Sequence, residues 1–295
     1  MTGRWLLVLA AALVLAGCGS VMRVVYNNSD FALRVMANEY FDTQGDQSEL
    51  LKAQLARFHE WHRREELPAY AQLFQGAAER AARGLTAEDV TWAIVSVRER
   101  YRLVVAQAAE DGAPVVATFT AENYAALDRK FADVNAKFTK DYLTGDQAKR
   151  NRARAKWFEE RFEWFIGDLT DAQVALIQRF VQTQPRMNEV RLADRKRRQQ
   201  EFVALIQQYQ KSPELGERMR DFFVYWERDR GAEHAKFARE WETQLVQLVV
   251  DIDRTLTPEQ RAKLVGRFDS LAEDCRVLAR QGRPAADTRA AAPAQ

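Results

Sequence analysis

The sequence predicts an all-α protein with about eight to ten helices and no β-sheet. Apolar residues recur along most of the chain at steps of three and four, and no convincing run alternates polar with apolar residues. Glycine and proline are scarce, with 13 and 7 residues among 295, whereas a β-protein needs many of both for its turns. The hydrophobic content of 47% excludes a disordered chain.

The apolar stripes that predict individual helices follow one another through the whole chain. Each has the spacing of one helical face, which buries against a neighbouring helix. In chain order the stripes are Leu33, Met36, Ala37 and Tyr40; Leu51, Leu55, Phe58 and His62; Val90, Ile94, Val97, Tyr101 and Val104; Phe158, Phe162, Phe165 and Ile166; Phe202, Leu205, Ile206 and Tyr209; and Phe237, Trp241, Leu245, Leu248 and Ile252.

Breaks between these helices are expected at proline and glycine. Pro68 should kink or end a helix near Leu67, because proline lacks an N–H and clashes with the preceding turn. Residues 111–114, which contain Gly112 and Pro114, are expected to form a loop. Further joins are expected at Gly145, Gly167, Gln184-Pro185 and Ser212-Pro213.

The domain organisation follows from these breaks. No change of composition divides the body of the chain, so we expect one helical domain over residues 30–281. Two lobes joined near residues 112–118 are the alternative. Residues 282–295 are alanine-rich without apolar anchors, which predicts a disordered tail.

A leucine-threonine motif recurs where four helices should begin. It predicts capping boxes, in which the threonine hydroxyl accepts from the backbone N–H three residues on, and that residue's side chain bonds back to the threonine N–H. The pairs are Thr86 with Asp89, Thr144 with Gln147, Thr170 with Gln173 and Thr257 with Gln260. The Leu-Thr-x-x-Gln pattern also resembles the signature of the periplasmic chaperones Spy and CpxP, which implies a holdase for unfolded proteins.

The first eighteen residues resemble a bacterial lipoprotein signal. Arg4 precedes the apolar stretch Trp5 to Leu15, which is too short to span a bilayer and is typical of a signal peptide over residues 1–17. Leu15-Ala16-Gly17-Cys18 resembles the lipoprotein box, which implies that Cys18 is acylated and anchors the protein to the membrane. Gly19 in place of aspartate implies the outer membrane, facing the periplasm.

Residues 18–29 are therefore expected to be a lipidated N-terminus and a short linker. Cys275 is the only other cysteine, so a disulfide scaffold and a cysteine-based zinc module are both excluded. We expect Cys275 to be a partly buried apolar residue of the last helix.

Catalytic and metal-binding patterns are sparse. His59 and His62 are three residues apart, whereas the zinc motif H-E-x-x-H needs four, so we predict no metal site. We find no phosphate loop or nucleophile motif, and therefore expect no cofactor and no enzymatic activity. A hydrolase that uses Glu65 or Glu66 is the enzymatic alternative. The net charge of +2 gives no reason to expect binding to nucleic acid.

Two surfaces are candidate binding sites. The first, at the expected kink, comprises Trp61, His62, Arg63, Glu66 and Tyr70. The second is a basic helix face that comprises Arg191, Arg195 and Arg198. A basic face can dock on anionic lipid headgroups or on an acidic envelope protein. A solvated face balanced by Asp194 and Glu201 is the alternative.

Three segments resemble a family of uncharacterised proteobacterial lipoproteins, which is classed as a domain of unknown function. They are Tyr26-Asn27-Asn28-Ser29-Asp30, Trp61-His62-Arg63-Arg64-Glu65-Glu66-Leu67-Pro68-Ala69-Tyr70 and Arg195-Lys196-Arg197-Arg198-Gln199-Gln200. Members usually have alanine where this chain has Ser29. The resemblance implies a lipid-anchored helical protein and assigns no catalytic residue. We therefore expect a non-enzymatic envelope protein that binds another protein or an anionic lipid surface.

Overall fold

The computed structural model describes residues 19–183, 187–228 and 231–281, and these residues form helices without any β-strand. The all-α prediction is confirmed. Because α4, η1 and α5 run on as one helix, the described residues contain 11 continuous helices, close to the number expected. The elements are α2 (Gly19–Asn27), α3 (Ser29–Phe41), α4 (Asp46–Trp61), the π-helical segment η1 (His62–Glu66), α5 (Leu67–Ala82), α6 (Ala87–Val116), α7 (Ala121–Tyr142), α8 (Gln147–Ile166), α9 (Asp171–Gln182), α10 (Met187–Tyr209), α11 (Leu215–Val224), α12 (Ala232–Arg254) and α13 (Pro258–Gln281).

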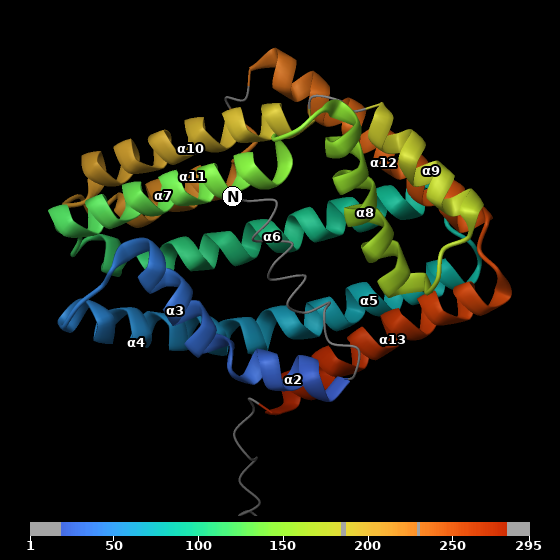
Figure 1. The fold of residues 1–295 in the computed structure, drawn as a ribbon. Coiled ribbons are helices and arrows are strands. Elements are labelled where there is room, and N and C mark those ends of the chain that lie inside the picture. Colours follow the sequence, from blue (N-terminus) through green and yellow to red (C-terminus); the bar gives the residue numbers. More distant parts are fainter. Residues whose placement is uncertain (1–18, 184–186, 229–230, 282–295) are drawn as a thin grey trace, which may run out of the picture.

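The helices gather into groups around three buried apolar clusters. The first cluster joins α3, α4, α6, α7, α10 and α11, and the second joins α8, α9, α12 and α13 with the end of α5. The third lies between α2, α5 and α13. Figure 1 shows α6 extending from the first group toward the second, where α8 crosses it in this view.

The predicted loop at residues 111–114 is wrong, because α6 continues through it to Val116. Pro114 lies near the C-terminal end of α6, so its missing N–H removes only one hydrogen bond of the last turns. Ala113, Val115 and Val116 are all buried in the first cluster. Their burial outweighs that loss, and the helix is retained.

Pro68 follows a local change of hydrogen bonding that does not end the helix. The N–H of Leu67 donates to the carbonyl of His62, five residues back, which is the π-helical pattern of η1. The wider turn accommodates the proline ring, and α5 continues directly from η1. The expected kink is thus a π-helical segment inside one long helix.

The structure confirms three of the four predicted capping boxes, at Thr86, Thr170 and Thr257. The prediction for Thr144 is wrong, because Asp146 caps α8 instead and accepts from the N–H of Lys149 at 2.7 Å. Gly145 between them has φ of 88° and turns the chain after Thr144.

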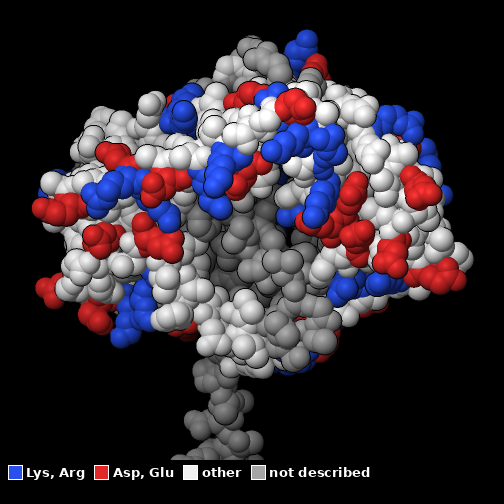
Figure 2. Space-filling model, in the orientation of Figure 1, with Lys and Arg blue, Asp and Glu red and all other residues white. Residues whose placement is uncertain are grey.

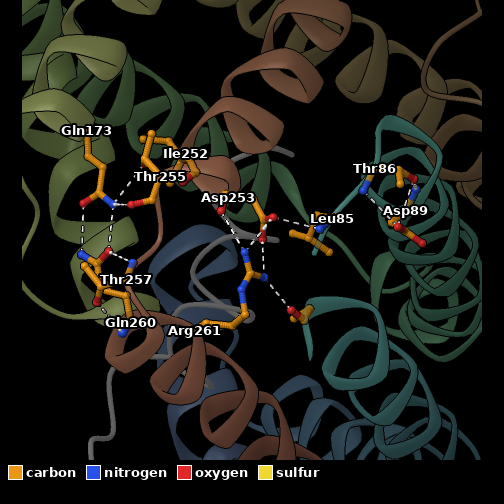
Figure 3. Close-up of polar contacts among 11 residues, drawn as sticks. Leu85, Thr86, Asp89, Gln173, Ile252, Asp253, Thr255, Thr257, Gln260 and Arg261 are labelled. Atoms are coloured by element: carbon orange, nitrogen blue, oxygen red, sulfur yellow. Dashed lines mark hydrogen bonds and ion pairs between the residues drawn. The ribbon is translucent and has the colours of Figure 1, made fainter. Parts of the chain in front are cut away.

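Two of these boxes meet inside the protein (Figure 3). Gln173 is fully buried and donates to the Oε1 of Gln260 at 2.9 Å, while Gln260 donates back at 3.1 Å. Beside them, Asp253 pairs with Arg261 at 3.0 Å and accepts from the N–H of Leu85 at 2.9 Å. These bonds satisfy the polar groups of helix ends that would otherwise be buried without partners. The Leu-Thr-x-x-Gln motif therefore has a structural role here.

The start of the chain differs from the predicted linker. Residues 19–27 form α2, which packs against α13. Residues 1–18 and 282–295 lie outside the described residues, so the signal peptide, the acylation of Cys18 and the disordered tail stay predictions.

Within the part of the chain that is described, no helix combines the length and the apolar character needed to cross a bilayer.

We predict that Thr170→Ala or Thr257→Ala lowers the free energy of unfolding by about 1 kcal/mol, because each removes a helix cap. Thr144→Ala is the matched control from the same motif, and it should change stability by less than about 0.5 kcal/mol. Urea denaturation of the three variants checks this. Equal losses for Thr144 and Thr170 would contradict the assignment of the caps.

Candidate functional site

The candidate site lies at η1, where the predicted binding residues split between the interior and the surface. His62 and Glu66 are buried, with 8% and 2% of their surface exposed. Trp61, Arg63 and Tyr70 are half-buried. The structure therefore brings all five residues together, but only some of them can reach a ligand. π-Helical segments often occur at functional sites, which directs attention to this one.

His62 is held by aromatic neighbours. Its Nδ1 lies 2.9 Å from the hydroxyl of Tyr26 on α2. The ring of Tyr70 packs edge-on against it, with ring centroids 5.5 Å apart. Burial, together with the smaller effects of the nearby His59 and Arg63, lowers the pKa of His62 to about 4. His62 is therefore neutral at pH 7 and links α2 to η1.

Glu66 points into the interior near one arginine. Its Oε1 lies 3.5 Å from Nη1 of Arg100 on α6. Its Oε2 is buried without a hydrogen-bond partner among the described residues. Burial raises the pKa of Glu66, and Arg100 opposes that shift. No group of three or more described side chains could hold a metal ion here or elsewhere in those residues.

An open groove of about 850 Å³ runs along the surface between α5 and α13. Its floor is made by small apolar residues such as Ala71 and Ala279, and its rims carry charged and amide side chains. The lining residues are Glu60, Arg63, Arg64, Pro68, Ala71, Gln72, Gln75, Gly76, Glu79, Arg276, Ala279 and Arg280.

Two of the four arginines that line the groove, Arg63 and Arg276, are fixed by the protein. Arg63 donates to the carbonyl of Leu278 at 2.8 Å and to the Oδ1 of Asn27 at 2.9 Å. Arg276 donates to the Oε1 of Gln75 at 2.6 Å. Each of these guanidinium groups is already positioned, so a ligand need not order it.

The charge of the lining favours an anionic ligand. Four of the lining residues are arginines and two are glutamates. Arg276 and Arg280 also pair with the exposed Glu273 at 3.6 and 2.9 Å, so a carboxylate of a ligand would take the place of this exposed acid. Arginine binds carboxylates through two parallel hydrogen bonds. Glu66 is absent from the lining, and Glu65 pairs with Arg64 at 2.8 Å. The groove is therefore suited to binding acidic groups.

The second candidate surface is not available for docking. Arg195 and Arg198 do share one face of α10, but that face points into the protein and leaves them 8% and 9% exposed. The guanidinium of Arg198 donates to the carbonyl of Trp226 at 2.8 Å and stacks on the ring of Phe222. Arg195 stacks on Phe138 in the same way. Only Arg191 of this set is exposed.

Elsewhere the surface carries mixed charge. Figure 2 shows lysine and arginine interspersed with aspartate and glutamate over one face of the molecule. In the basic segment of α8, Lys149, Arg152 and Lys156 are exposed whereas Arg154 is buried. Lys156 lies 4.0 Å from Glu160. Exposed pairs of this kind contribute little to stability and suit a solvated face.

The fold is all-α and carries an arginine-lined groove between α5 and α13. Residues 39–230 match the model of DUF6279, a family of unknown function, and the chain belongs to this family. No curated protein and no solved structure matches the chain. The matched region includes η1 and the α5 side of the groove, whereas α13 lies beyond it.

Sequence reasoning missed the α13 side of the groove. Arg276 and Arg280 are four residues apart, so their spacing alone places them on one helical face. The spacing does not show which helix packs against that face. This helix is α5, which begins at Leu67, some two hundred positions earlier.

We predict that His62 makes folding dependent on pH. Its folded pKa of about 4 lies below the ordinary 6.5, so the unfolded chain takes up a proton first as the pH falls. The stability that neutral His62 provides is complete above pH 6.5 and declines as the pH falls toward 4, by roughly 3 kcal/mol in all. Urea denaturation across this range should show a shallower decline for His62→Gln. Identical slopes for the two proteins would contradict the burial of His62.

We predict that Arg198→Glu destabilises the fold by about 3 kcal/mol or more, because it buries an unpaired carboxylate in place of a hydrogen-bonded guanidinium. Arg152→Glu, at an exposed position of α8, should change stability by less than about 0.5 kcal/mol. Thermal and urea denaturation measure both. A fully stable Arg198→Glu protein would show that this side chain faces solvent.

Proposed function

We propose that this protein is an outer-membrane lipoprotein that faces the periplasm and binds an acidic segment of another envelope protein, without catalysing a reaction. The observation that carries this proposal is the α5–α13 groove with its two prepositioned arginines. A segment with several carboxylates would pair with Arg63, Arg64, Arg276 and Arg280 along the rims.

The groove and the proposed anchor lie close together. Acylation at Cys18 would place the lipid one residue before α2. On α2, Arg23 pairs with Asp274 of α13 at 2.8 Å, and Asn27 bonds Arg63 of the groove. A helix of nine residues is about 13 Å long. The groove therefore sits near the membrane surface, within reach of other membrane-anchored proteins.

A protein segment fits the groove better than a lipid surface does. A bilayer presents a broad surface, whereas the acceptor here is concave and lined on both sides by helices. A single extended or helical segment can enter such a groove and contact both rims. The two glutamates of the lining would select for a segment whose carboxylates face the arginines.

The two alternatives have less support. A holdase needs exposed apolar grooves, but this groove carries charged rims, and the Leu-Thr-x-x-Gln motif is used for helix caps. A hydrolase would need Glu65 or Glu66 at a substrate site, but neither lines the groove.

The anchor is tested by mass spectrometry of the mature N-terminus and by membrane fractionation. We expect an acylated Cys18 and recovery with the outer membrane, and release into the soluble periplasmic fraction for Cys18→Ser carried by an ordinary signal peptide. An unmodified Cys18, or recovery of the variant with the membrane as before, would overturn the anchor.

The groove is tested by a photo-crosslinking residue at Gln72, which lines the groove and is exposed. We expect one dominant envelope protein, crosslinked through an acidic segment. Arg64→Glu should lower the crosslinking yield at least tenfold; a tenfold loss of affinity corresponds to about 1.4 kcal/mol of binding free energy. Arg254→Glu is the matched control, because the two side chains are 67% and 69% exposed and each pairs with a neighbouring acid.

An unchanged yield with Arg64→Glu, or an equal loss with Arg254→Glu, would contradict binding in the groove. A broad set of unrelated unfolded proteins at Gln72 would favour the holdase instead.

A further inference from the structure

A group of large apolar side chains is exposed at the beginning of the described chain. Among the side chains that the structure describes, eight large apolar ones are exposed, and half of these fall within residues 24–35, so their exposure is concentrated rather than scattered. They are Val24, Val25, Phe31 and Val35, and the most exposed are Val24 at 60% and Phe31 at 59%. We call these four residues the apolar stripe.

The other side of the same helices is packed against the protein. Tyr26 is buried against α5 and α13, and Arg23 pairs with Asp274. α2 and α3 are separate helices joined at Asn28, whose φ of −106° and ψ of 12° are not helical. Phe31 and Val35 are four residues apart on α3, which places these two on one side of that helix. Val24 and Val25 are exposed on α2, whose Tyr26 is buried.

The position of the stripe identifies what covers it. This step rests on the proposed acylation of Cys18. Val24 lies six residues after Cys18, which is about 9 Å along a helix, and Phe31 and Val35 follow on the next helix, α3. A lipid anchor at Cys18 would hold these side chains against the membrane, and Figure 1 shows α2 at the edge of the molecule, beside the end of α13.

The charges around the stripe suit a membrane interface. The guanidinium of Arg34 lies 5.5 Å from the ring centroid of Phe31, where it can reach lipid phosphates while the ring enters the acyl region. Asp30 is the acidic residue beside Phe31 and is exposed, so it can remain in the headgroup layer.

We infer that α2 and α3 lie in the interface of the lipid bilayer, with Val24, Phe31 and Val35 inserted below the headgroups. The acyl chains supply the attachment, and the stripe fixes the orientation of the body. This contact presents the α5–α13 groove at a fixed angle to the membrane, because α2 bonds to both α13 and Arg63.

The test uses the full acylated protein in vesicles of phosphatidylethanolamine and phosphatidylglycerol. An environment-sensitive fluorophore is attached at Val24→Cys, Phe31→Cys or the control Val97→Cys, each in a Cys275→Ala background. Val97 lies on α6 and is 56% exposed, so the control is also an exposed apolar site. We expect blue-shifted emission and protection from iodide quenching at positions 24 and 31, and neither at position 97.

The outcomes separate the stripe from the anchor. If the acylated protein floats with the vesicles but the labels at 24 and 31 are quenched like the one at 97, the inference is overturned while the anchor stands. If Cys18 is not acylated, both fail. A blue shift of the unacylated Cys18→Ser protein in buffer, growing with protein concentration, would show that a second copy covers the stripe and would also overturn the inference.

Discussion

The packing of α13 along α5 is the contact on which the rest of this structure depends. Its seam consists of Leu67, Ala71, Leu271, Cys275 and Leu278, all of them buried. The two small residues allow the helices to approach closely, and each buried leucine contributes about 1.5 to 3 kcal/mol. Because α5 lies in the first third of the chain and α13 ends its described part, this contact joins segments far apart in sequence.

The groove, the π-helical segment and α2 all lie on this contact. The groove is the outer surface of the seam, and α2 docks across its end through the Arg23–Asp274 pair. Arg63 of η1 bonds the carbonyl of Leu278, so the π-helical segment is fixed to α13 as well. At the opposite end, the Gln173–Gln260 pair fixes where α13 begins. A partner in the groove would therefore contact the part of the protein nearest to the proposed anchor.

Much of the fold could be predicted from the sequence because helical periodicity and capping are local. The boxes at Thr170 and Thr257 depend on residues three positions apart, and they were found. The prediction of a loop at Pro114 was wrong because its neighbours are buried by helices that lie far away in the sequence. The prediction that Arg198 lies on an exposed binding face was wrong for the same reason, because its guanidinium donates to the carbonyl of Trp226 on another segment. The groove needed α5 and α13 to be placed together, which no local pattern reveals.

Hydrogen–deuterium exchange of the wild type and of Leu278→Ala tests most directly whether the α5–α13 contact holds these features together. The substitution leaves a cavity in the seam and should cost about 2 to 5 kcal/mol. Exchange should then accelerate in α2, η1, α5 and α13 together, while α7 and α10 keep their protection. Acceleration confined to the last turn of α13, or spread evenly over every helix, would contradict this.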